Sequence, residues 1–138
     1  MVTGKNTFSK EERICIDRQI TRLFEQGASF ICYPVRVVWI ESQETSSKPV
    51  KILISVSKKK LRHSVDRNRV KRLIRESYRI NKSKLNEAAQ SAGKVVSICF
   101  IWLPSEAVEF IKMERKMREA LDKISFQIDA HKKKPDHE

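Results

Sequence analysis

The sequence predicts an α+β fold in which helices pack against a small β-sheet. Apolar residues recur at helical spacing in three segments, and three further runs of strand length are rich in β-branched and aromatic residues. The order is helix, strands, helix, strand, helix, without internal repeats. With 138 residues and 40% apolar composition the chain can close one core. We expect a single domain over residues 1–130 and a disordered basic tail over 131–138.

The opening helix is expected over residues 9–26. Ser9 followed by Glu12 has the pattern of a capping box, and apolar side chains then recur at helical spacing. Gly27 provides a stop signal at the C-terminal end. The segment therefore predicts an amphipathic helix.

Two strands are expected next, over 30–41 and 50–57. Both segments are rich in β-branched residues, and the polar stretch 42–49 between them is typical of a turn. They therefore predict a hairpin. Pro34 cannot donate a hydrogen bond to a ladder, so we expect it at a strand edge or a bulge.

A central helix is predicted from Asp66 to Asn81, followed by a polar segment near 81–94, a buried strand over 95–103 and a closing helix. Narrow apolar stripes define the two helices. The central helix carries Val70, Leu73, Ile74 and Ser77, and the closing helix carries Val108, Ile111, Met117, Leu121, Ile124 and Ile128.

Positive charge is concentrated in one segment. The chain has 29 Lys and Arg against 17 Asp and Glu, a net charge of +12, and ten of these charges fall within residues 58–84. Such a concentration indicates a polyanionic partner. At 100° per residue, five donor-bearing side chains of the central helix share an arc of about 100°, roughly opposite its apolar stripe. These are Asn68, Lys71, Arg72, Arg75 and Arg79.

Three alternatives to RNA binding explain the charge of the central helix less well. They are a face that contacts only solvent, a membrane-surface helix and a helix that reads a DNA groove. Solvated helix faces usually interleave Glu with Lys, and only Glu76 interrupts this one. A membrane-surface helix would need an apolar wedge where the core stripe lies, and no window has the ~20 apolar residues of a membrane span. A helix-turn-helix reader of DNA would need a second helix just before this one. The segment favours recognition of structured RNA.

No hydrolytic or metal site is evident in the sequence. Cys15, Cys32 and Cys99 are too widely spaced for a zinc site, and we expect reduced, mostly buried thiols. The carboxylates lack the paired spacing of general acid–base chemistry. We therefore predict neither catalytic nor metal-binding residues on the protein.

The segment VSKKKLRHSVDRNRVKRLIRESYR resembles the signature of the protein subunits of bacterial ribonuclease P. Its features are a strand ending in VSKK, a short basic loop and a helix of the pattern RNRxKRLxRExxR. The order of elements also resembles that of the family, from the opening helix to about Ile128. The matching residues are Val56, Ser57, Lys58, Lys59, Arg67, Asn68, Arg69, Lys71, Arg72, Leu73, Arg75, Glu76 and Arg79.

The resemblance implies an α-β-β-β-α-β-α sandwich with a left-handed βαβ crossover. It also implies a cytoplasmic protein, monomeric without RNA, that assists a catalytic RNA subunit in the Mg²⁺-dependent removal of the 5′ leader from precursor tRNA. By position, the RNA subunit would be bound by Arg67, Asn68, Arg69, Lys71, Arg72, Arg75 and Arg79. The leader would be bound by Phe24, Arg36, Lys58, Lys59, Lys60 and Arg62.

Three alternatives remain open at this point. Phe24 could be a core residue. Arg36, Val38 and Ile40 alternate with Val35, Val37 and Trp39, and the sequence leaves open which set faces the leader. The chain could also be a ribosomal or general RNA-binding protein without a catalytic partner.

Overall fold

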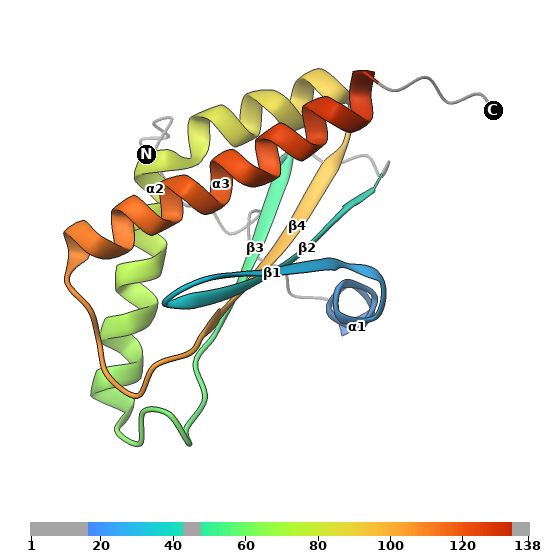
Figure 1. The fold of residues 1–138 in the computed structure, drawn as a ribbon. Helices are drawn as coiled ribbons and strands as arrows, with labels where there is room; N and C mark the ends of the chain where they lie inside the picture. Colours follow the sequence, from blue (N-terminus) through green and yellow to red (C-terminus); the bar gives the residue numbers. More distant parts are fainter. Residues whose placement is uncertain (1–16, 43–47, 134–138) are drawn as a thin grey trace, which may run out of the picture.

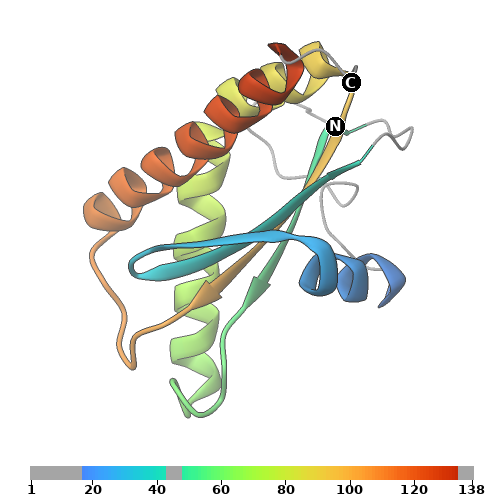
Figure 2. The same ribbon diagram turned by 45° about the vertical axis from the view of Figure 1, so that its right-hand side comes forward.

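The computed structural model describes residues 17–42 and 48–133 (Figure 1). Two long helices lie side by side on one side of a four-stranded sheet, and a short helix lies on the other side (Figure 2). The predicted α+β architecture and its α-β-β-β-α-β-α order are confirmed. The elements are α1 (Asp17–Gln26), β1 (Ala28–Cys32), β2 (Val35–Ser42), β3 (Val50–Ser55), α2 (Ser64–Ala92), β4 (Val95–Trp102) and α3 (Phe110–Lys133).

The hairpin lies elsewhere than the sequence predicted. The segment expected to be one strand over 30–41 is two antiparallel strands, β1 and β2, which turn at Tyr33 and Pro34 through a cis peptide bond. Strand β3 does not pair with β2. The sheet order is β1-β2-β4-β3, with β4 antiparallel to β2 and parallel to β3. Pro34 lacks an N–H and suits a turn, so it divides the apolar run.

The register divides the sheet into two faces, because side chains alternate along each strand. On one face Val37, Ile98, Phe100 and Ile52 join the core beneath α2 and α3. On the other, which we call the open sheet face, α1 covers only part of the sheet. Leu23 of α1 packs there against Val38 and Cys99, with Ile20, Ile40, Leu53 and Ile101 partly buried around them.

Helix α1 ends at Gln26, as the stop signal at Gly27 predicted. A Cβ at Gly27 would lie 2.4 Å from the carbonyl oxygen of Leu23 and 2.9 Å from that of Trp39, so the close approach of helix and strand requires glycine there. The predicted helix residues 9–16, with Ser9 and Glu12, lie outside the described residues, as does Cys15.

Helix α2 is much longer than predicted and has 29 residues. The predicted stripe is confirmed, with Val70, Ile74 and Ser77 buried and Leu73 partly buried. The segment expected to be polar and non-helical continues the helix, because Leu85 and Ala89 extend the buried stripe. Gly93 caps the end in the left-handed conformation, with φ 69°.

Helix α3 begins at Phe110, so Val108, the first residue of the predicted stripe, lies before the helix, where it is partly buried against the core. Met117, Leu121, Ile124 and Ile128 are buried as predicted, but the prediction for Ile111 is wrong, since it is 78% exposed. Met113, two residues later, fills the core position instead. The helix extends to Lys133, within the segment expected to be a tail, and residues 134–138 lie outside the described part.

Candidate nucleic-acid interface

The segment between β3 and α2, residues 56–63, forms a compact basic loop. Ser57 organises its first half: its carbonyl oxygen accepts from the backbone N–H groups of Lys60 and Leu61, and its Oγ accepts from that of Lys59. Leu61 is 6% exposed and anchors the loop in the core. The charged side chains are left in solvent, namely Lys58, Lys59, Lys60 and Arg62.

Arg67 ties the second half of this loop to α2. Its Nη1 donates to the carbonyl oxygens of Leu61 and Arg62, at 2.9 Å each. The side chain is half-buried, so at least part of its donor capacity is directed at the protein's own backbone. This contact distinguishes Arg67 from the other predicted RNA contacts on the helix.

The outer side of α2 carries the basic face, which we define as Asn68, Arg69, Arg72, Arg75 and Arg79. A hollow of about 490 Å³ lies against the first turns of the helix, where Val65 and the first four of these residues line it. Lys71 is half-buried and lies outside this lining. The hollow therefore gathers three guanidinium groups and one amide of the predicted set.

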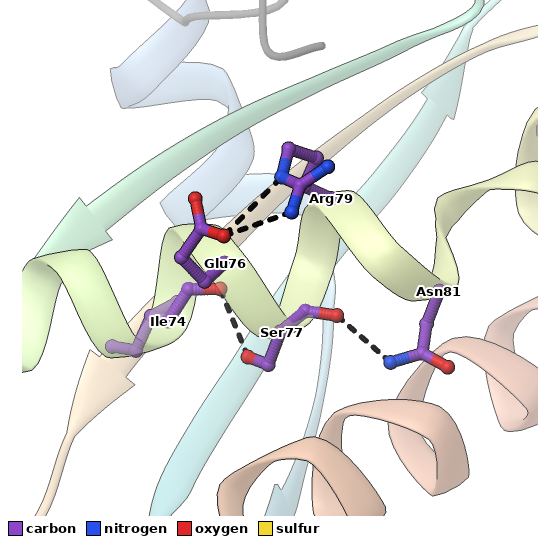
Figure 3. A network of polar contacts seen from close by, with 5 residues as sticks. All are labelled: Ile74, Glu76, Ser77, Arg79 and Asn81. Atoms are coloured by element: carbon purple, nitrogen blue, oxygen red, sulfur yellow. Dashed lines mark hydrogen bonds and ion pairs between the residues drawn. The ribbon is translucent and has the colours of Figure 1, made fainter. Parts of the chain in front are cut away.

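Further along α2, Arg79 is held by Glu76. Its Nε and Nη2 both approach the Oε1 of Glu76, with the shorter distance, from Nη2, being 2.9 Å (Figure 3). The pair is partly exposed. Glu76 thus offsets the charge of Arg79, and the strongest uncompensated charge of the basic face lies toward the start of α2.

The opposite side of α2 fixes the helix against α3. The hydroxyl of Ser77 donates to the carbonyl oxygen of Ile74, and Asn81 donates through Nδ2 to that of Ser77 (Figure 3). The same amide nitrogen reaches Glu114 of α3 at 3.1 Å, and Arg118 donates to the other oxygen of Glu114 at 2.9 Å. The hydrogen bonds from Arg118 and Asn81 lower the pKa of Glu114, which favours its charged form.

Arg36 lies on the open sheet face, together with Val38 and Ile40. Ile31, Arg36, Ile101 and Ser55 form one row across the four strands. Arg36 is exposed, and its Nε donates to Ser29 Oγ at 3.1 Å. Because β3 ends at Ser55, this row adjoins the start of the basic loop.

Phe24 is not a core residue. Leu23 is fully buried against the sheet, while Phe24 beside it is 49% exposed. Ile31, on the Arg36 row, is 66% exposed and adds apolar surface to the open sheet face. The structure thus places the predicted leader residues on α1, the open sheet face and the basic loop, and the predicted RNA-subunit residues on α2.

The described side chains offer neither a metal-binding group nor an activated cysteine. Within 17–42 and 48–133 no three His, Cys, Asp or Glu side chains are grouped so that they could hold a metal ion. Burial raises the pKa of the Cys99 thiol to about 12, and burial together with Glu119 raises that of Cys32, so neither is an activated nucleophile. Among the same residues, no helix combines the length and apolar character that a membrane span requires.

Sequence reasoning missed the residues that hold the interface rather than form its surface. The backbone contacts of Arg67 carry no sequence signal, because RNA-binding and loop-holding arginines look alike in a basic run. The Asn81–Glu114 contact joins residues 33 positions apart. A signal for Asn81 was available in its helical spacing from Ser77 and Leu85, had the helix been continued.

Comparison with known proteins assigns the family. The profile of the family described as Ribonuclease P matches residues 8–125. The ribonuclease P protein component of Porphyromonas gingivalis strain ATCC 33277 is 39% identical over 126 residues, covering 90% of this chain and 92% of that protein. That of Chlorobaculum tepidum is also 39% identical, over 79 residues that cover 54% of this chain and 51% of its own.

Solved structures agree with this assignment. The RNase P protein of Staphylococcus aureus superposes with a TM-score of 0.66 at 26% identity, covering 84% of this chain and 96% of its own. That of Thermotoga maritima, at 24% identity and a TM-score of 0.65, covers 81% and 96% and shares the fold. The predicted resemblance is confirmed, and the chain belongs to the ribonuclease P protein family, whose members are components of a tRNA-processing ribonucleoprotein.

Proposed function

We propose that this protein binds the RNA subunit of ribonuclease P through α2 and the 5′ leader of precursor tRNA through the open sheet face and the basic loop, in the cytoplasm. The observation that carries the proposal is the hollow on α2, where Arg69, Arg72 and Arg75 converge without an acidic side chain in the described lining. Guanidinium groups bind phosphate through paired N–H donors. A folded RNA presents several phosphates on its surface that such a group of arginines can bind.

The α2 surface suits a rigid partner. The helix is fixed to the sheet by Ile74 and Tyr78 and to α3 through Asn81, so its arginines are presented from an ordered support. A support of this kind holds donors in a fixed pattern, which favours a particular arrangement of phosphates over diffuse charge attraction. The proposed RNA-subunit contacts are Asn68, Arg69, Lys71, Arg72, Arg75 and Arg79. Arg67, which the resemblance also assigned to this surface, donates to the backbone of the basic loop.

The open sheet face suits a single strand of RNA. Phe24 and Ile31 give apolar surface on which bases or sugars can pack, and Arg36 adds a cation beside it. The basic loop adjoins the Arg36 row and supplies Lys58, Lys59, Lys60 and Arg62 for the strand's phosphates. Mixed stacking and charge of this kind bind single strands with little sequence preference.

In this proposal the cleavage chemistry belongs to the RNA subunit. The described side chains do not fit a Mg²⁺ site, so we derive no step through a metal on the protein. Mg²⁺ would be held by phosphate oxygens of the RNA. The protein, a monomer without RNA in this proposal, would reduce repulsion between substrate and catalytic RNA and lower the Mg²⁺ concentration needed for cleavage.

The test is cleavage of a precursor tRNA by a bacterial ribonuclease P RNA at low millimolar Mg²⁺, with and without the protein. Leader removal that requires both components is the expected result. If the folded protein gives no stimulation with the RNA of its own organism, the holoenzyme function is wrong and a general RNA-binding role takes its place.

A second test separates a shaped site from general charge attraction. Arg72→Ala removes an arginine of the hollow, and Arg115→Ala removes an equally charged, exposed arginine of α3. We expect Arg72→Ala to weaken RNA-subunit binding about tenfold, as for loss of one charge-assisted hydrogen bond, and Arg115→Ala to change it little. Equal losses would indicate attraction by net charge alone.

A further inference from the structure

The two arginines of the Arg67-Asn68-Arg69 sequence have different surroundings. Arg69 is exposed and lines the hollow on α2. Arg67 is half-buried and donates from a single nitrogen, Nη1, to the successive carbonyl oxygens of Leu61 and Arg62. Identical side chains two residues apart are therefore directed toward different partners.

The carbonyl geometry shows what Arg67 does to the basic loop. In an extended chain, successive carbonyl groups point to opposite sides. Here two successive carbonyls converge on one nitrogen, so the backbone at Leu61 and Arg62 is turned rather than extended. Arg67 thereby holds this turn, which is also anchored by the buried side chain of Leu61.

The loop needs such a support because of its own charge. Lys58, Lys59, Lys60 and Arg62 repel one another when they are held close together. Ser57 organises the first half of the loop through three backbone N–H groups. The helix start offers no further help, since the N-cap residue His63 makes no side-chain capping bond. Among the described residues, Arg67 supplies side-chain hydrogen bonds to the second half of the basic loop.

We infer that Arg67 is a positioning residue that fixes the basic loop in its leader-binding conformation, and that it is not one of the ligands for phosphates of the RNA subunit. The inference rests on the proposed function, which assigns the loop to the leader and the basic face to the RNA subunit. Arg67 and Arg69 then have two different roles. Arg69 binds the RNA subunit, and Arg67 acts on the substrate through the loop.

The matched variants are Arg67→Met and Arg69→Met, which remove the same charge and keep an unbranched side chain. In the free protein, hydrogen exchange of the Lys60 and Leu61 amides reports the loop directly. We expect exchange about tenfold faster in Arg67→Met, from loss of a charge-assisted contact, and no change in Arg69→Met. Unchanged exchange in Arg67→Met would overturn the inference.

Binding measurements then separate the two jobs. For the RNA subunit, Arg69→Met should lower the slope of log affinity against log salt by about 0.7–0.9, the value for one phosphate, while Arg67→Met leaves the slope unchanged. For the holoenzyme, Arg67→Met should weaken binding of precursor tRNA about tenfold when the leader is long, and little when it is one nucleotide. A slope reduced equally by both variants, or a loss independent of leader length, would overturn the inference.

A third variant keeps the inference testable if Arg67→Met does not fold. Ser57→Ala loosens the same loop from its other half without changing charge, and we expect the same leader-dependent loss with an unchanged salt slope. Leader binding unaffected by Ser57→Ala would contradict a role for the loop's conformation. The exchange experiment needs no RNA, so it tests the contact of Arg67 even if the wild-type protein fails to stimulate cleavage, which would refute the proposed function instead.

Discussion

The two faces of the sheet are covered to very different extents. Beneath α2 and α3, Val37, Ile98 and Phe100 are fully buried in one large cluster with both helices. On the open sheet face the buried cluster formed by the described residues is Leu23, Val38 and Cys99, and Ile31 remains largely exposed. Apolar burial is the main source of folding free energy. The face beneath α2 and α3 therefore contributes most of the folding free energy, while the described residues leave part of the open sheet face exposed.

This difference in cover also leaves room for the two proposed RNA-binding surfaces on one small domain. Helix α2 uses its inner side for the closed core, which leaves its outer side free for cations held on a rigid support. On the other face, the described part of α1 packs against β2 and β4 at Val38 and Cys99. The proposed RNA-subunit and leader surfaces thus use different side chains, and they meet where the basic loop enters α2.

The largest expected effect comes from neighbouring residues of β4 that point to the two faces. Phe100→Ala empties a fully buried site under α2 and should lower the free energy of unfolding by about 3–5 kcal/mol. Ile101→Ala removes a partly buried side chain on the open sheet face and should cost roughly 1–2 kcal/mol. Denaturant unfolding measures both. Equal losses of unfolding free energy would show that the two faces of the sheet contribute equally to stability.

Helix α1 offers the same comparison within one element. Leu23→Ala should lower the free energy of unfolding by about 2–4 kcal/mol, because it removes the buried contact with Val38 and Cys99. Phe24→Ala should cost about 1 kcal/mol or less, yet weaken leader binding by about 1–3 kcal/mol if a base stacks on the ring. Leader binding unchanged in a folded Phe24→Ala protein would remove Phe24 from the proposed surface.

A smaller effect is expected where α2 ends above the face that it covers with α3. Gly93 has a φ of 69°, and a Cβ there would meet no atom within 4 Å, so Gly93→Ala adds backbone strain without a clash. We expect a loss of about 1 kcal/mol in unfolding free energy. Gly93→Asn is the control, because Asn tolerates this conformation better and should cost less.

The smallest effect concerns pH and the contact between α2 and α3. The hydrogen bonds from Arg118 and Asn81 lower the pKa of Glu114 below its ordinary value of 4.5. The stabilisation is therefore complete above that value and is lost as the pH falls through the lowered pKa. The Glu114→Gln protein should lack this loss of stability at low pH. Thermal unfolding of both proteins from about pH 6 to pH 3 checks it, and parallel curves would contradict it.

Local patterns in the sequence predicted the elements but not all of their partners. The stripe of Val70 and Ile74 identified the first half of α2, since its apolar side is continuous. The second half was missed because Leu85 and Ala89 are separated by polar residues, and their burial depends on packing against α3, which is distant in sequence. Likewise the run from Phe30 to Glu41 indicates extended structure, but strand partners are set by contacts between distant segments.

The candidate site was predictable to the level of its surface residues. Charge density and helical spacing placed Asn68, Arg72 and Arg75 on one face, and all three line the hollow. Spacing also put Lys71 on that face, although it lies outside the lining, and it left out Arg69, which only the family resemblance assigned to the site. The contact of Arg67 with the loop backbone was not predictable, because hydrogen bonds to main-chain oxygens leave no pattern of side-chain types. The side of the sheet occupied by Arg36 depended on where α1 packs.

Strand β4 lies between β2 and β3 although it is the last strand to be synthesised. Until it is in place, the β1–β2 hairpin and β3 have no common neighbour, and neither the closed core nor the seat of α1 on Cys99 can form. Pairings between segments far apart in sequence form late and slowly. A nascent chain that stops short of Val95 would therefore hold α2 without its support. The proposed RNA-binding surfaces should then form together, in one cooperative step near the end of translation.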